Sequence, residues 1–115
     1  ITRVGDLNKV NNFTVELDEY KRKAEILKAL SHPARLCIVR GLLTEKGCNV
    51  SKMQECLEIP QSTLSQHLAK LRNLDILKGE RDGVEMNYFV ISEKAKRIIK
   101  VLFSEDIEGG EGNYE

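Results

Sequence analysis

Residues 59–74, IPQSTLSQHLAKLRNL, contain no aspartate or glutamate, although 18 of the 115 residues in the chain are acidic. Leu64, Leu68 and Leu71 recur at the spacing of one helical face, which predicts an amphipathic helix over residues 61–73. The opposite face is built from short side chains that donate and accept hydrogen bonds, with a cation at its edge: Ser62, Ser65, Gln66, Ala69, Lys70 and Asn73. Such a face matches the chemistry of base edges in the major groove of DNA.

The absence of carboxylates from this helix also favours a negatively charged partner. Lys70 and Arg72 lie one turn beyond the polar residues, where a phosphate backbone would pass. Gln61, Ser62 and Thr63 lie at the helix start, where free backbone N–H groups favour a phosphate oxygen. The alternative is a solvated surface helix whose short, uncharged face arose by chance. Most solvated faces are rich in Glu and Lys instead.

The elements around this helix are predicted from periodicity, capping and turn chemistry. Ser31, Ser51 and Ser92 are the expected N-caps of the second, third and last helices. Beyond residue 75 the apolar period changes to two, and Arg81-Asp82-Gly83 has the composition of a turn. The predicted elements are helices over residues 16–30, 32–43, 51–57, 61–73 and 92–103 and strands over residues 76–78 and 86–91. This order predicts a mainly α fold with a β-hairpin wing, the winged helix-turn-helix.

Composition divides the chain into one domain and two polar ends. Hydrophobic content of 41% and charged content of 31% are typical of a globular domain, which we expect over residues 16–103. Residues 1–15 lack periodicity and are predicted to form a flexible arm. Residues 104–115 are predicted to be a disordered acidic tail. Five of the 18 acidic residues lie in this tail, so the rest of a chain with zero net charge has a charge of +5.

The cysteine count and the hydropathy pattern favour a cytoplasmic protein. Cys37, Cys48 and Cys56 are odd in number and irregularly spaced, which indicates a reducing environment and no disulfide scaffold. No apolar run approaches the roughly 20 residues needed to cross a bilayer, and no signal-peptide pattern opens the sequence. We therefore expect no membrane partner.

Two segments in combination resemble the ArsR/SmtB family of small bacterial winged-helix repressors. They are LKALSHPARLCIV, residues 27–39, and QSTLSQHLAKLR, residues 61–72, and the similarity extends over residues 25–103. The resemblance implies a homodimer formed by the first and last helices that binds an inverted repeat in operator DNA. The apolar stripes of residues 16–30 and 92–103 agree with this, because both helices have more apolar surface than so short a chain can cover alone.

The resemblance also implies site residues in two elements. The positions that match the DNA-contacting helix of the family are Gln61, Ser62, Thr63, Ser65, Gln66, His67 and Lys70. Lys78, Arg81 and Gly83 match the wing. At the tip of the hairpin, Arg81 would contact phosphate or an adjacent minor groove. The alternative for Arg81 is an exposed turn cation paired with Asp82.

Many family members sense metals, and the motifs for that function are missing here. One motif is a Cys-x-Cys before the recognition helix, and this sequence has Asn49 and Ser51 at those positions. The other uses Asp and His on the last helix, and SEKAKRIIKVLF contains no His. A zinc site needs several such ligands at one point. We therefore predict no metal and no cofactor, and keep a metal-responsive repressor as an alternative.

Thiol chemistry is another candidate means of control. Relatives that sense oxidants pair a cysteine of the second helix with one late in the last helix. This chain has Arg40 at the first of those positions and no cysteine in its last helix. Cys37, near two arginines, and Cys48, in a loop, are the candidate redox residues. Cys56 is predicted to be a buried small hydrophobe. Control by the protein's own abundance, or by a ligand that the sequence does not reveal, is the remaining alternative.

An enzyme is not expected, because the sequence has neither a nucleophile–base signature nor a phosphate-binding glycine loop. The stronger rival function is a winged-helix protein-interaction module that does not bind DNA. A protein-binding helix should expose aromatic or large aliphatic anchors. The outer face of residues 61–73 has none, which favours DNA.

Overall fold

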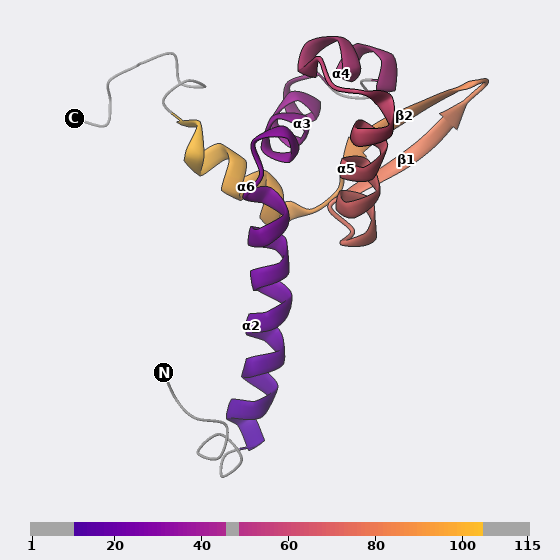
Figure 1. Cartoon of the computed structure of the whole chain (residues 1–115). Coiled ribbons are helices and arrows are strands. Elements are labelled where there is room, and N and C mark those ends of the chain that lie inside the picture. Colours follow the sequence, from indigo (N-terminus) through magenta and orange to yellow (C-terminus); the bar gives the residue numbers. More distant parts are fainter. Residues whose placement is uncertain (1–10, 46–48, 105–115) are drawn as a thin grey trace.

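The computed structural model describes residues 11–45 and 49–104, and for residues 11–15 the backbone alone. Within these described residues, five helices and a two-stranded hairpin follow one another in the order α2 (Asn11–Leu30), α3 (Pro33–Thr44), α4 (Val50–Leu57), α5 (Gln61–Asn73), β1 (Leu77–Asp82), β2 (Glu85–Val90) and α6 (Glu93–Leu102). Figure 1 shows α2 projecting as a rod from a body formed by the other elements, with the hairpin extending from that body. The predicted winged helix-turn-helix is confirmed.

The core lies where α3, α5, α6 and the base of the hairpin meet. Among the described residues, every buried residue is hydrophobic and belongs to this core. The core residues are Ala29, Leu30, Ile38, Val39, Leu42, Met53, Leu64, Leu68, Leu71, Ile76, Leu77, Tyr88, Ala95 and Ile99. The predicted inner face of α5, formed by three leucines, is fully buried in this cluster. The core therefore fixes the rotation of α5 and leaves its polar face outward.

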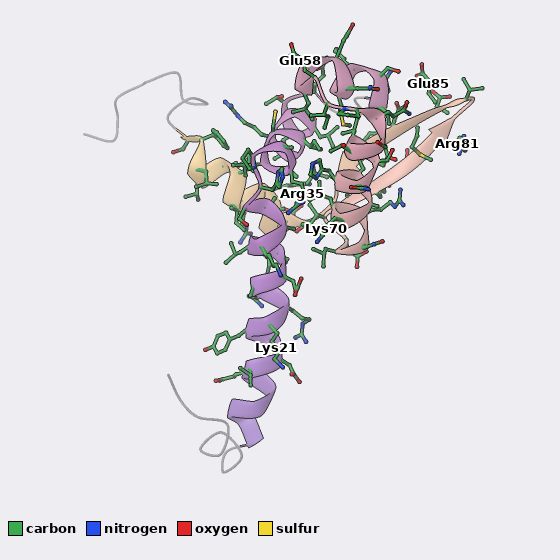
Figure 2. The ribbon with its side chains drawn as sticks, in the orientation of Figure 1. Lys21, Arg35, Glu58, Lys70, Arg81 and Glu85 are labelled. Atoms are coloured by element: carbon green, nitrogen blue, oxygen red, sulfur yellow. The ribbon has the colours of Figure 1, made fainter. Side chains whose placement is uncertain are left out.

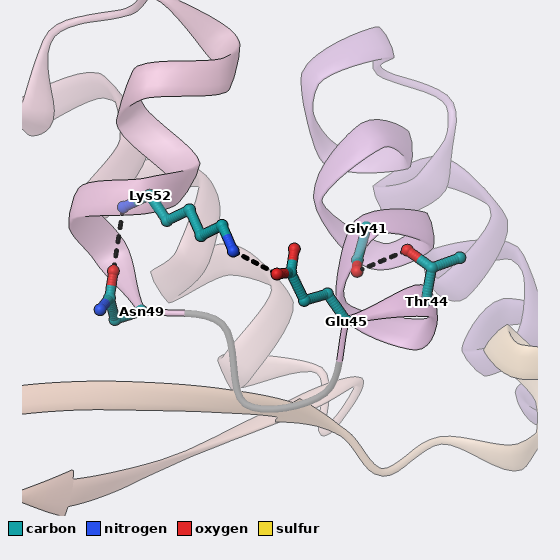
Figure 3. Close-up of polar contacts among 5 residues, drawn as sticks. All are labelled: Gly41, Thr44, Glu45, Asn49 and Lys52. Carbon is teal, nitrogen blue, oxygen red and sulfur yellow. Dashed lines mark hydrogen bonds and ion pairs between the residues drawn. The ribbon is translucent and has the colours of Figure 1, made fainter.

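The helix-turn-helix consists of α4 and α5, joined by residues 58–60. The predicted bounds of α5 are confirmed, but the predicted cap of α4 is wrong. Asn49 and not Ser51 is the N-cap, because its side-chain oxygen accepts a hydrogen bond from the backbone N–H of Lys52 at 2.9 Å (Figure 3). Glu58 ends α4 in the left-handed conformation, with φ 56°. That conformation turns the chain directly into Pro60 and α5.

Glu58 occupies a backbone conformation that costs an L-residue with a β-carbon about 1–2 kcal/mol. We expect Glu58→Gly to raise the free energy of unfolding by about 0.5 kcal/mol, because glycine adopts this conformation freely but loses more entropy on folding. Glu55→Gly, the same change inside α4, should lower it by about 1 kcal/mol. Urea denaturation of both variants measures the two effects, and equal signs would contradict this account of Glu58.

The wing is an antiparallel hairpin in which Leu77 pairs with Val90 and Asp82 with Glu85. Its loop is Gly83-Val84, and Gly83 has φ +68°, which a two-residue hairpin loop requires at its first position. The turn is thus shorter than predicted. Arg81 lies within β1 opposite Met86, near the tip and not at it.

Two predictions near the N-terminus need correction. α2 begins at Asn11 and not near residue 16, so residues 11–15 of the expected arm are helical; extending an existing helix costs far less than nucleating one. Residues 1–10 of that arm, and 105–115 of the expected tail, lie outside the described residues. The N-cap of α3 is His32 and not Ser31, because Nδ1 of His32 accepts from the backbone N–H of Ala34 at 3.1 Å. The Ser31 hydroxyl instead donates to the carbonyl of Lys28.

Candidate DNA interface

The outer face of α5 is exposed and free of carboxylates. Five of the seven predicted contact residues on this helix are exposed: Gln61, Ser62, Ser65, Gln66 and Lys70. Thr63 is half-buried at the edge of this face. Because the helix begins directly after Pro60, with no side chain capping it, the N–H groups of its first turn are available to an anion. We call Gln61, Ser62, Thr63, Ser65, Gln66 and Lys70 together the polar face of α5. Figure 2 shows Lys70 on this helix and Arg81 on the hairpin.

His67, the remaining predicted contact, lies on the flank of α5 that faces α3. Its ring lies against the ring of His32, with 4.6 Å between centroids. Nη1 of Arg35 is 3.3 Å from Nδ1 of His67, and Nε of Arg35 donates to the carbonyl of Ala29 at 2.6 Å. His67 therefore joins the recognition helix to the start of α3. The sequence predicted a DNA contact for this side chain, and its partners on α3, more than 30 residues away in sequence, could not be found from local periodicity.

Partial burial lowers the pKa of His67 below its ordinary value of 6.5, and the nearby His32 and Arg35 lower it further. A histidine with a lowered native pKa stabilises the fold while neutral, and that stability is lost as the pH falls through the native pKa. We expect the free energy of unfolding to fall between pH 7 and pH 5.5. His67→Gln keeps an acceptor for Arg35 without the titration, so the fall should be shallower. Urea denaturation of both proteins at pH 7 and pH 5.5 measures this fall. An equal fall in the free energy of unfolding of the two proteins would contradict the role assigned to His67.

The wing supplies the other two predicted contacts. Lys78 is exposed and forms an ion pair with Glu80 at 2.8 Å, which places a carboxylate beside a candidate phosphate contact. Arg81 is exposed. Adjacent strand residues point to opposite faces, which directs the side chains of Arg81 and Asp82 apart. Val84 is 94% exposed at the tip, and sequence reasoning did not single it out.

Asn49 connects the helix-turn-helix to the wing. It caps α4, forms an antiparallel bridge with Asn87 in β2, and its Nδ2 lies 3.4 Å from Oε1 of Glu85. Lys52 of α4 in turn contacts Glu45 at the end of α3 (Figure 3). These contacts hold α4 between α3 and the hairpin. The sequence had identified Asn49 only as a position where metal-sensing relatives have cysteine.

Two cysteines line one small pocket between α3 and α4. Cys37 and Cys56 are both exposed, and the pocket of about 140 Å³ is otherwise mainly apolar, with Met53 and Leu57 in its wall. The prediction that Cys56 is buried is therefore wrong, because α4 lies at the edge of the body and only Met53 among its residues is fully buried. Cys48 lies outside the described residues.

The described residues hold neither a cluster of metal ligands nor a helix suited to cross a membrane. Within residues 11–45 and 49–104, no group of three or more His, Cys, Asp or Glu side chains is placed to hold a metal ion. None of the helices there is both long enough and apolar enough to cross a bilayer.

Known proteins similar in sequence to this chain include transcriptional repressors. A helix-turn-helix domain model matches residues 30–80. The transcriptional repressor PagR of Bacillus anthracis is 42% identical over 88 residues, which cover 76% of this chain and 88% of PagR. The repressor SmtB of Mycobacterium tuberculosis is 35% identical over 75 residues, 65% of this chain and 55% of SmtB. The chain belongs to the ArsR/SmtB family.

Solved structures of family members agree with this fold. The crystal structure of PagR matches with a TM-score of 0.67 over 75% of this chain and 98% of that one. HlyU from Vibrio cholerae matches with a TM-score of 0.71 and 30% identity, over 75% of this chain and 92% of that one. As an ArsR/SmtB protein, the chain is a DNA-binding transcriptional regulator with a winged helix-turn-helix and not an enzyme.

Proposed function

We propose that this protein is a homodimeric repressor that acts in the cytoplasm by binding an inverted-repeat operator, with α5 of each protomer in the major groove. The observation that supports this most directly is the exposed, carboxylate-free polar face of α5, held outward by three buried leucines. Side chains on such a helix reach base edges without repelling phosphates. The two-fold symmetry of a dimer would set two recognition helices one DNA turn apart.

The proposed dimer uses the exposed apolar surface of α2 and α6. Among the described residues, four of the six exposed large hydrophobic side chains lie on these helices: Tyr20, Leu27, Val101 and Leu102. A groove of about 300 Å³ between α2 and α6 is lined by Leu27 and Ile98, with cations at its rim. Exposed apolar side chains on two helices that border a groove are typical of a protein–protein interface.

Within this proposal each site residue has a distinct task. The first turn of α5, residues 61–63, binds a phosphate through backbone N–H groups. Ser65 and Gln66 contact base edges, and Lys70 contacts the backbone. Lys78 and Arg81 bind phosphates flanking the site through the wing. Since His67 is engaged with α3, we assign it a positioning role for α5 in place of a direct contact.

Two single substitutions in α5 separate base readout from phosphate binding. Gln66→Ala should reduce discrimination between the operator and unrelated DNA by about 1–3 kcal/mol, because an amide that pairs with a base edge is lost. Lys70→Ala should weaken binding to both DNAs by a similar factor and lower the salt dependence by about one phosphate contact. Fluorescence anisotropy on the DNA upstream of the protein's own gene, with competitor DNA at several salt concentrations, measures both.

A matched control for these variants is Lys21→Ala, since Lys21 is exposed on the projecting part of α2, away from α5 and the hairpin (Figure 2). It should leave both affinities unchanged. If Gln66→Ala and Lys70→Ala also changed nothing, the protein-interaction module would be the better account. A selection from random-sequence DNA would then distinguish a wrongly chosen operator from a protein that does not bind DNA.

Thiol control is part of this proposal, with a revised pair of residues. Cys37 and Cys56 are both exposed and line the same pocket. Cys56 is therefore the proposed partner of Cys37 in thiol chemistry. Peroxide converts a thiolate to a sulfenic acid, which condenses with a second thiol to a disulfide and water. Mild peroxide should abolish operator binding by the unsubstituted protein. Operator binding that survives peroxide in Cys37→Ser and in Cys56→Ser would support this pair. Operator binding that survives peroxide only in Cys48→Ser would assign control to Cys48.

A further inference from the structure

A second, larger pocket opens between α3, β2 and α6 and has no role in the function proposed above. Its volume is about 500 Å³, within the range of small-molecule sites. The floor is apolar, formed by the buried Leu42 and Ile99 and the half-buried Phe89 and Val90. It therefore offers a surface for a hydrocarbon chain or ring.

The rim of this pocket is cationic. Arg40, Lys96 and Lys100 are among its lining residues, and none of the lining residues is a carboxylate. The guanidinium of Arg40 lies 4.1 Å from the centroid of the Phe103 ring, which fixes it at the α3 edge. Nζ of Lys96 donates to Glu93 at 3.1 Å, but Glu93 is 73% exposed, and such a surface pair is weak enough to exchange for another anion.

The pocket is separate from the surface proposed for dimerisation. At 100° per residue, Lys96 and Lys100 lie on one flank of α6, whereas Lys94 and Ile98 lie on the other, beside α2. A partner protomer docked on the α2–α6 groove would therefore leave the entrance beside Lys100 open. Lys100 is itself exposed.

We propose that this pocket binds a monocarboxylate with an apolar chain of medium length. Its carboxylate would bind at Lys100 and Lys96, next to Arg40, and its chain would cover Phe89 and Ile99. A small inorganic anion would leave the apolar floor in water, and a neutral apolar molecule would offer no charge to the cationic rim. Only a molecule with both a negative head and an apolar body satisfies both parts of the pocket.

Occupancy should also be transmitted to the DNA-binding surface. β2 supplies Phe89 and Val90 to the pocket and Glu85 and Met86 to the outer end of the wing. A ligand that shifts β2 would reposition the wing and α4, which Asn49 bridges to Asn87. This regulatory consequence rests on the proposed function, whereas binding at the pocket does not.

The test is a titration of the full-length, ¹⁵N-labelled protein with decanoate below its micellar concentration, followed by amide chemical shifts. We expect saturable shifts at Phe89, Val90, Ile99 and Lys100. Decanol, which lacks the charge, and acetate, which lacks the chain, should bind at least tenfold more weakly. Decanol binding as tightly as decanoate, shifts confined to the α2–α6 groove, or no saturable shifts would each overturn the proposal.

Two lysines on opposite flanks of α6 provide a matched pair of variants. Lys100→Gln should weaken decanoate binding roughly fivefold, the size of one surface ion pair. Lys94→Gln, which removes the same charge from the other flank, should have no effect. Equal weakening by both would indicate non-specific charge attraction and overturn the assignment. Because this readout contains no DNA, its failure is distinguishable from failure of operator binding, which anisotropy measures separately.

Discussion

Replacing Leu27 by lysine is expected to convert the protein to a monomer and to weaken operator binding by at least a hundredfold. Leu27 is 56% exposed on α2 and lines the groove that α6 completes. This groove is already lined by the cations Lys23, Lys94 and Arg97, so the new lysine would be repelled by like charges. Burying its ammonium group in the apolar interface would also cost several kcal/mol of desolvation free energy. A monomer would contact one half-site and lose the second set of contacts entirely.

Sedimentation velocity measures the mass of this variant, and anisotropy measures its affinity for full and half operators. The control is Glu25→Lys, which also introduces lysine on an exposed position but on the opposite side of α2. It should remain dimeric. A Leu27→Lys protein that remained dimeric and bound the full operator normally would rule out the α2–α6 dimer.

The second large effect is expected from Leu68→Ala in the core. Leu68 is 2% exposed between two other buried leucines of α5. Truncating it removes apolar burial and leaves a cavity, and such changes cost about 2–5 kcal/mol. A domain of this size has a total stability of about 5–15 kcal/mol, so the variant should lose a large fraction of it and unfold at a lower temperature.

Circular dichroism during urea and thermal denaturation measures this loss. Gln66→Ala, two residues away on the exposed face of the same helix, should change stability by no more than about 0.5 kcal/mol. If Gln66→Ala keeps its stability, a loss of its preference for the operator over unrelated DNA cannot be due to unfolding. Equal destabilisation by the two variants would contradict the orientation of α5.

The recognition helix was predictable to the residue because several independent signals coincide there. Pro60 lies directly before the first residue of α5, and three leucines at helical spacing define the inner face of this helix. The cysteines were harder to assign. Cys56 belongs to an amphipathic helix, but the width of the buried stripe depends on how much of α4 the neighbouring elements cover. The sequence does not contain that information locally.

Helix caps and the hairpin loop show a second kind of limit. Ser31 and His32, or Asn49 and Ser51, are competing caps within two residues of each other, and the choice depends on backbone angles set by the packed body. His67 illustrates a third limit. Its chemistry suggested DNA, yet its contacts with His32 and Arg35 arise only once α3 and α5 are packed together.

The projecting α2 helix has a consequence for how the protein responds to its own concentration. Residues 16–25 are all exposed except Leu17, so in the proposed dimer much of this helix would gain burial only from the second chain. Folding and assembly are then linked, and the melting temperature should rise as protein concentration increases. In a cell, newly made chains at low copy number would be mainly unpaired and inactive. Silencing would therefore begin only after enough protein had accumulated, which makes expression level itself a signal.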